Sequence, residues 1–257
     1  MSLLPRDHPH STGPTDLSDP PDGREALPRT VDDPPRHVAF IVDGNRRWAR
    51  AHGHPIELGH RKGADNVRRA VHWCEAVGIE TTTWWLLSTD NLNRTSVELH
   101  KLLDIISELT HHLAATGHWR MRHLGDPRLL PPSLATALSE AETSTRHNQG
   151  PQINFAVGYS GREDILAAAR RIAHQAVEST AFSVSERSFA QALSTSGLPD
   201  PDLVIRSSGE QRLSGFMLWQ AALSELYFCP VLWPDFTRSD LDRALAFYAN
   251  RQRRFGR

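Results

Sequence analysis

The stretch HVAFIVDGNRRWARAHG, His37–Gly53, joins an apolar segment directly to a polar turn. Its first six residues are mostly apolar and partly β-branched, which is typical of a buried strand. The strand runs straight into Asp43, Gly44 and Asn45, and two arginines and a tryptophan follow. A carboxylate, an amide and two guanidinium groups at the end of a core strand indicate a binding site. For this loop alone, the alternative is a turn whose arginines are merely solvated.

The composition of the 257-residue chain is that of a globular protein, with 39% hydrophobic and 23% charged residues. The 29 basic and 30 acidic residues nearly balance, so we expect no nucleic-acid partner. Cys74 and Cys229 form neither a disulfide framework nor a zinc pattern, which favours a reducing cytoplasm. No apolar run reaches the roughly 20 residues of a transmembrane segment, and the first residues lack a signal core. We therefore expect a soluble protein.

Residues 1–36 differ from the remainder of the chain. They contain eight of the 17 prolines and show almost no apolar periodicity. Such a composition predicts a disordered, proline-rich tail. We expect residues 37–257 to form one folded domain.

From His37 onward, short apolar runs alternate with helical patterns. The predicted strands are His37–Val42, Thr81–Leu87, Arg120–Leu124, Ile153–Tyr159 and Leu203–Arg206. Helices are predicted within 63–78 and 95–113, and at Pro132–Arg146, Arg162–Val177, Ser185–Ser194 and Ser239–Arg253. This alternation predicts a single α/β domain with a mostly parallel central sheet flanked by helices. Ligands of such sheets bind at the carboxyl ends of the strands, where DGNRRW lies.

The residues of DGNRRW suit a diphosphate group. Gly44 permits a tight turn, and a helix beginning near Asn45 would present free N–H groups to an anion. Arg46 and Arg47 supply fixed positive charge for phosphate oxygens. Asp43 is an oxygen ligand of the type that Mg²⁺ takes together with substrate phosphates. The loop therefore predicts a diphosphate–Mg²⁺ site, and it matches neither a Walker loop nor a dinucleotide fingerprint.

Two further strand ends carry similar side chains. The first supplies Ser88, Asp90, Asn91 and Arg94, and the second Arg206, Arg212 and Ser214. Unpaired buried guanidiniums are costly, so these sets indicate two polyanions. Glu225 interrupts a downstream apolar run, where a carboxylate needs a cation or a hydrogen-bond donor.

Apolar side chains stand between these polar segments in the sequence. They are Trp84, Trp85, Leu86, Leu87, Leu102, Ile105, Ile106 and Leu109. Core packing is the default role for each. Together with the polar strand ends, they also suit an amphiphile that has a diphosphate head and a hydrocarbon tail.

From His37 to Arg254 the sequence resembles the cis-prenyltransferases, the undecaprenyl-diphosphate-synthase-like family. The resemblance rests on HVAFIVDGNRRWA, GHRKGA, LSTDNLNR, VGYSGREDI and PDPDLVIRSSGEQRLSGFMLWQAALSELYFCPVLWPDF. It implies an enzyme that condenses isopentenyl diphosphate with an allylic diphosphate primer (dimethylallyl, geranyl or farnesyl) and forms a new cis double bond. It also implies Mg²⁺ as cofactor and a homodimer, and a hydrocarbon product would allow peripheral membrane contact.

The resemblance also implies roles for individual residues. Asp43 would assist departure of the allylic diphosphate, and Asn91 belongs to a loop implicated in substrate placement and proton removal. Asp43 and Glu225 would hold Mg²⁺, with Glu225 coming from the partner subunit. The implied substrate-binding residues are Gly44, Asn45, Arg46, Arg47, Trp48, His60, Ser88, Thr89, Asp90, Arg94, Arg206, Arg212 and Ser214.

The chain departs from the long-chain members at several positions. Ile56 replaces an arginine, Leu92 a tryptophan and Gly215 an asparagine. Leu86 and Leu87 replace the alanine and phenylalanine that are common in long-chain members. In this the chain resembles the short-chain actinobacterial branch that makes cis-farnesyl diphosphate. A bulky Leu86 would stop the growing tail, because overpacking costs ~1–3 kcal/mol. We therefore expect a product of about three isoprene units.

Three alternatives remain open. They are a long-chain polyprenyl diphosphate synthase, an enzyme that couples allylic units irregularly, and a non-catalytic partner subunit. Retention of Asp43, Arg206 and Arg212 argues against the last of these.

Overall fold

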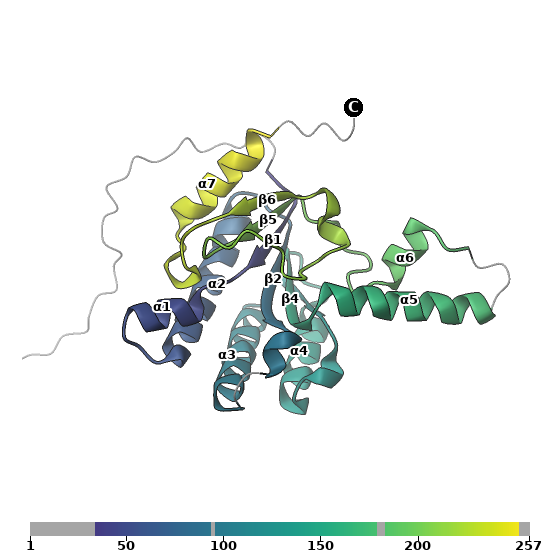
Figure 1. Ribbon diagram of the computed structural model, residues 1–257, viewed down its shortest axis with the longest axis horizontal. Helices are drawn as coiled ribbons and strands as arrows, with labels where there is room; N and C mark the ends of the chain where they lie inside the picture. Colours follow the sequence, from purple (N-terminus) through teal and green to yellow (C-terminus); the bar gives the residue numbers. More distant parts are fainter. Residues whose placement is uncertain (1–33, 94–95, 179–182, 252–257) are drawn as a thin grey trace, which may run out of the picture. The chain divides into compact units, whose positions relative to one another are not determined.

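Six strands form one sheet in the part of the chain that the computed structural model describes, residues 34–93, 96–178 and 183–251 (Figure 1). The order across the sheet is β3-β4-β2-β1-β5-β6, and all neighbours are parallel. The strands are β1 His37–Ile41, β2 Thr81–Ser88, β3 Arg120–Leu124, β4 Gln152–Tyr159, β5 Leu203–Arg206 and β6 Glu225–Phe228. The predicted α/β class and parallel sheet are therefore confirmed.

The first five strands agree with the sequence prediction to within one residue at each end. The edge strand β6 was missed. It has four residues, all of them only half-buried, and its apolar residues Leu226–Phe228 directly follow the charged Glu225. Its pairing with β5, which aligns Glu225 with Leu203, is a tertiary contact that local sequence does not encode.

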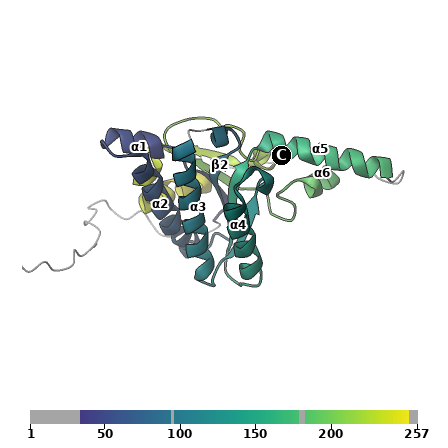
Figure 2. The same cartoon turned by 90° about the horizontal axis from the view of Figure 1, so that it is seen from below.

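Seven α-helices accompany the sheet in the described residues. They are α1 Asn45–Ala51, α2 Ile56–Ala76, α3 Ser96–Ala115, α4 Pro132–Thr145, α5 Gly161–Glu178, α6 Glu186–Ala192 and α7 Arg238–Ala249. Short 3₁₀ helices lie at Asp90–Asn93 (η1), Pro127–Leu129 (η2), Gln220–Leu223 (η3) and Trp233–Asp235 (η4). The α5–α6 pair extends away from the sheet (Figures 1 and 2).

Helix α2 begins seven residues earlier than the sequence pattern predicts. Gly59 and Gly63 weaken the helical pattern, because glycine is a poor helix former. The structure shows their use: a Cβ at Gly63 would stand 2.4 Å from Asn45 Oδ1, and one at Gly59 would stand 2.3 Å from the Asn45 carbonyl oxygen. The two glycines therefore allow α1 to pack closely on α2, and this packing outweighs the low propensity.

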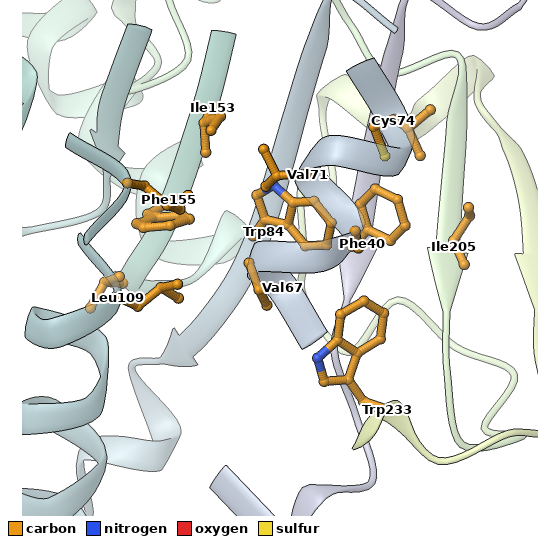
Figure 3. Packing of buried hydrophobic residues seen from close by; sticks show 14 of the residues in the cluster. Phe40, Val67, Val71, Cys74, Trp84, Leu109, Ile153, Phe155, Ile205 and Trp233 are labelled. Carbon is orange, nitrogen blue, oxygen red and sulfur yellow. The ribbon is translucent and has the colours of Figure 1, made fainter. Parts of the chain in front are cut away.

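The main hydrophobic core lies between one face of the sheet and helices α2, α3, α4 and α7. Figure 2 shows α2, α3 and α4 side by side on this face. Val38 and Phe40 of β1 point into this core, as strand alternation requires. Phe40 stacks on Trp84 with ring centroids 4.1 Å apart, and Trp233 packs against both rings (Figure 3).

The opposite face of the sheet carries a smaller core. Ala39 and Ile41, the alternate residues of β1, pack there with Tyr159 at the end of β4. Phe216 and Met217, from the segment between β5 and β6, cover them. This segment therefore lies against the sheet close to the carboxyl ends of its strands.

The first 33 residues, which include most of the predicted tail, lie outside the described residues. Contacts with the folded part are already present at Arg36, just before the predicted boundary. Its backbone N–H donates to Asp202 Oδ2 (2.9 Å), and its guanidinium pairs with Glu80 (2.9 Å). Among the described residues, no helix is long and apolar enough to span a bilayer.

Candidate active site

A cavity of about 480 Å³ lies at the carboxyl ends of β1, β2 and β5. This is the edge of the sheet at which the polar strand ends were expected to meet. Its polar lining comes from Asp43, Asn45, Arg46, Arg47, Arg50, His60, Ser88, Asp90, Asn91, Arg206 and Ser214. Its apolar lining includes Trp85, Leu86, Leu87, Ala64, Val67, Leu102, Ile105, Ile106, Leu109 and Trp233. Three segments that are distant in sequence therefore form one amphiphilic cavity, and Trp84 lies in the core instead.

Asp43 lies at the centre of the polar wall. Its Oδ2 accepts hydrogen bonds from Arg206 Nη2 (2.9 Å), Ser208 Oγ (3.0 Å) and Arg47 Nη2 (3.2 Å). Burial acts to raise the pKa of the Asp43 carboxyl. The hydrogen bonds from Arg206 and Ser208 and the charges of Arg206 and Arg47 outweigh burial, so the pKa lies below its usual value. Asp43 is therefore ionised near neutral pH.

Arg206 links Asp43 to the following loop. Its side chain is only 5% exposed, and its Nη1 donates to Ser214 Oγ (2.7 Å) and to the carbonyl oxygen of Arg212 (2.5 Å). A buried guanidinium needs such partners, because an unpaired charge is costly there. The Arg212 side chain itself pairs with Glu210, is 60% exposed and does not line the cavity.

Arg46, His60 and Glu98 connect α1, α2 and α3. Glu98 Oε1 lies 3.2 Å from Arg46 Nε and 3.5 Å from His60 Nε2. Arg46 and His60 both line the cavity. Glu98 therefore holds one of the cavity arginines by an ion pair, and its carboxylate is largely buried.

Gly44 allows the turn between β1 and α1. Its φ of 112° lies in the region that glycine favours, and a Cβ there would stand 2.9 Å from the Leu232 side chain. Helix α1 begins at Asn45, as the sequence indicated, but it is only seven residues long. The positive charge of this wall therefore comes mainly from the arginines. Asn45 Oδ1 is buried without a hydrogen-bond partner in the described part of the chain.

The end of β2 continues into η1. Ser88 Oγ accepts a hydrogen bond from the Asn91 backbone N–H (3.2 Å), which orients this turn. Ser88, Asp90 and Asn91 line the cavity, whereas Thr89 does not. Arg94 lies outside the described residues, so the structure does not place it.

Leu86 occupies a β-bulge. Trp85 pairs with Ala156 and Leu87 pairs with Val157, so Leu86 is the extra residue opposite β4. Neighbouring residues of a regular strand point to opposite faces, but a bulge re-aims the side chain. Leu86 and Leu87 consequently both line the cavity, as their predicted effect on chain length requires.

Four of the predicted site residues in the described part of the chain lie outside the cavity lining, namely Thr89 and Arg212 and also Trp48 and Glu225. Trp48 is buried on α1, where its Nε1 donates to Asp235 Oδ1 (2.7 Å) and its ring stacks on His52. Glu225 begins β6 and pairs with Arg251 at 3.3 Å. Neither side chain lines the cavity in its observed position.

Ser207 and Ser208 belong to the site, and the sequence prediction missed them. Ser207 Oγ donates to the Asp43 carbonyl oxygen (2.7 Å) and accepts from the Asp43 backbone N–H (2.9 Å). Ser208 Oγ contacts both the Asp43 carboxylate and Arg47. The signal was present in RSSG, since two hydroxyl residues follow the buried arginine at the end of β5.

The residues near Asp43 fit a magnesium ion that arrives with a diphosphate. The hydrogen bonds from Arg206, Ser208 and Arg47 all end on Asp43 Oδ2, which leaves Oδ1 as the oxygen available to a metal ion. No cluster of three or more histidine, cysteine or acidic residues suited to a metal occurs among these residues. A single carboxylate holds Mg²⁺ weakly, but Mg²⁺ commonly combines one carboxylate with substrate phosphates and water.

Comparison with known proteins places the chain in a family. Residues 41–256 match the family described as "Putative undecaprenyl diphosphate synthase". The (2Z,6E)-farnesyl diphosphate synthase of Thermobifida fusca is 49% identical over 86% of this chain and 90% of its own length. Isoprenyl transferase 1 of Streptomyces avermitilis is 48% identical over 88% of this chain and 90% of its own length.

A solved structure shows the same fold. Lavandulyl diphosphate synthase from Lavandula x intermedia, in complex with dimethylallyl diphosphate, superposes with a TM-score of 0.82. It is 39% identical, and the match covers 87% of this chain and 98% of that one. The chain therefore belongs to the cis-prenyltransferase family of undecaprenyl-diphosphate-synthase-like proteins.

Proposed function

We propose that this protein is a Mg²⁺-dependent, short-chain cis-prenyltransferase that joins isopentenyl diphosphate to an allylic diphosphate. The observation that carries the proposal is the position of Asp43, held between Arg47 and Arg206 in the polar wall of an amphiphilic cavity. The similarity to a (2Z,6E)-farnesyl diphosphate synthase supports the same class of reaction.

The polar wall suits the diphosphate head groups. Arg46, Arg47, Arg50 and Arg206 line the cavity, while Asp43 and Asp90 are the only acidic side chains among its described lining residues. Excess positive charge favours a polyanion, and guanidiniums bind phosphate oxygens through paired hydrogen bonds. The Asn45 amide and the Ser214 hydroxyl add neutral hydrogen-bonding groups. We infer that the allylic diphosphate lies near Asn45–Arg47 and isopentenyl diphosphate near Arg206 and Ser214.

The reaction breaks the allylic carbon–oxygen bond, and its electron pair leaves with the diphosphate. The arginines stabilise the charge that develops on this leaving group, and they do so more strongly as the bond breaks. Bound Mg²⁺ would supply further neutralisation of that charge. The double bond of isopentenyl diphosphate then forms the new carbon–carbon bond, and loss of a proton restores a double bond. We place Asn91 and Ser88 beside this step, because they line the cavity at the end of β2.

The apolar wall suits the hydrocarbon tail and excludes water from the electron-poor carbon. Leu86 and Leu87 project into the cavity together because of the bulge in β2. A longer tail would have to displace them or pass between α2 and α3. On this basis we propose a short product such as cis-farnesyl diphosphate.

We further propose that the protein acts as a cytoplasmic homodimer. Glu225 lies outside the cavity of its own chain, so a role in holding Mg²⁺ requires that it reach the cavity of a second copy. The hydrocarbon product would bring the dimer into peripheral contact with a membrane.

A product assay tests this function. The protein is incubated with Mg²⁺, labelled isopentenyl diphosphate and dimethylallyl, geranyl or farnesyl diphosphate in separate reactions. We expect products of about three isoprene units and no activity after chelation of the metal. Products of ten or more units would refute the short-chain assignment, and the absence of any prenyl product would refute the function.

Irregular coupling is the second candidate, and the likeness to lavandulyl diphosphate synthase favours it. An enzyme of that kind would convert dimethylallyl diphosphate alone. Omission of isopentenyl diphosphate from the assay separates the two, since the proposed condensation then yields nothing.

A further inference from the structure

Ser208 combines an unusual backbone conformation with a central position in the polar wall. Its φ of 83° lies in the left-handed region, which is disfavoured for residues that carry a Cβ. The residue is buried, with 8% of its surface exposed. Glycine adopts this conformation freely, so a non-glycine residue here needs a reason.

Backbone hydrogen bonds to other strand ends hold this conformation. The Ser208 N–H donates to the Val231 carbonyl oxygen (2.7 Å), and the Gly209 N–H donates to the Cys229 carbonyl oxygen (2.8 Å). The preceding Ser207 N–H donates to Ile41, the last residue of β1 (3.3 Å). The turn is therefore fixed by β1 and by the segment after β6, whichever side chain residue 208 carries.

The side chain of Ser208 joins two charged groups. Its Oγ donates to Asp43 Oδ2 (3.0 Å) and accepts from Arg47 Nη2 (2.6 Å). The Asp43–Arg47 pair is itself longer, at 3.2 Å, and both of its side chains are partly exposed. A hydroxyl that bonds both groups defines their relative positions more closely than their direct contact does.

We propose that Ser208 is a positioning residue, whose hydroxyl fixes the Asp43 carboxylate and the Arg47 guanidinium for the diphosphate. The left-handed backbone is the structural cost of placing that hydroxyl at the end of β5. This inference rests on the proposed function, and it adds a residue that acts through Asp43 and Arg47.

Two substitutions separate the hydroxyl from the strain. Ser208→Ala removes the hydroxyl and keeps the strain, whereas Ser208→Gly removes both. Both variants should lose about tenfold to a hundredfold in kcat, because a hydrogen bond to a charged group is lost. Ser208→Gly should nevertheless melt roughly 2–8 °C above Ser208→Ala, because only glycine tolerates this φ.

Ser139 is a matched control. It is exposed in the interior of α4 and does not line the cavity. The order of stability should reverse there, with Ser139→Ala melting above Ser139→Gly, because alanine is the better helix former. Neither control substitution should change kcat.

Binding of inorganic pyrophosphate by calorimetry gives a readout that does not depend on turnover. Both Ser208 variants should bind it about tenfold more weakly than the wild-type protein. Wild-type kcat and pyrophosphate affinity in a folded Ser208→Gly protein would overturn the proposal. If Ser208→Gly is less stable than Ser208→Ala, the backbone of residue 208 is not strained, and that part of the proposal is refuted. If the wild-type protein forms no prenyl product, the proposed function fails, whereas pyrophosphate affinity and melting order still test Ser208.

Discussion

Arg206 Nη2 lies 2.9 Å from Asp43 Oδ2, although the two residues are 163 positions apart in the chain. The parallel pairing of β1 with β5 places Ile41 beside Arg206, and Asp43 follows two residues later. The carboxylate is therefore ionised and held by two guanidiniums before any substrate binds. Such preorganisation avoids the reorganisation that water would require when the leaving group develops charge.

The first prediction concerns Asp43. Asp43→Asn keeps the size of the side chain but removes its charge and its capacity to share in metal binding. We expect kcat to fall about a hundredfold to a thousandfold, comparable to the loss of one preorganised transition-state contact. Steady-state assays with labelled isopentenyl diphosphate measure this. Asp126→Asn, which alters a surface pair with Arg128, is the control and should retain full activity.

The second prediction concerns the limit on chain length. Leu86→Ala should lengthen the product by at least one isoprene unit, because it removes a side chain that the bulge directs into the cavity. Since Leu86 is only half-buried, the loss of stability should stay at or below about 2 kcal/mol. Chromatography of the labelled products measures the length. An unchanged product would show that another residue stops the tail. Leu223→Ala, at an exposed position, is the control and should leave the product length unchanged.

The third prediction tests a site shared between two copies of the chain. Asp43→Asn and Glu225→Gln proteins should each be nearly inactive. If Glu225 serves the cavity of the partner, each mixed dimer contains one site with both native residues. Random mixing should then restore about a quarter of wild-type activity, because half of the dimers are mixed and each has one intact site of two.

The control for this experiment is the mixture of either variant with itself, which should remain inactive. Differently tagged chains verify that mixed dimers form. If these mixed dimers are inactive, Glu225 lies outside the active site. Its pairing with Arg251 would then be its whole role.

The fourth prediction concerns pH. His37 is buried between the Pro199 carbonyl oxygen and Thr83 Oγ1, both at 2.8 Å. Burial lowers the pKa of His37 from 6.5 to about 4, although the hydrogen bond to Pro199 opposes this. Above pH 6.5 the imidazole is neutral in both folded and unfolded protein, so it contributes no pH dependence. Between pH 6.5 and 4 only the unfolded protein binds the proton, and the free energy of unfolding should fall by about 3 kcal/mol.

Urea unfolding across this range measures the effect. Burial also lowers the pKa of His123, so it adds to the same slope. His37→Gln should flatten the profile, whereas substitution of the exposed His174 should not. A flat wild-type profile between pH 6.5 and 4 would contradict the prediction.

Local sequence was sufficient for most of the secondary structure. Strands β1, β2, β4 and β5 are mostly apolar or β-branched, and all five predicted strands were confirmed within one residue. The start of α2 was predicted too late, because Gly59 and Gly63 obscure its pattern and are explained only by the packing of α1. Strand β6 was missed, because its four half-buried residues become a strand through their pairing with β5, which is a tertiary contact.

For the site, sequence identified the residue types and tertiary structure decided which of them meet. DGNRRW and the arginine at the end of β5 indicated phosphate binding from their chemistry alone. Three features could not be inferred in this way. They are the bulge that turns Leu86 into the cavity, the burial of Trp48 against Asp235 and the contact of Ser208 with Asp43. The physical reason is that periodicity and turn chemistry report interactions between near neighbours. These contacts arise only when strands from distant parts of the chain align in one sheet.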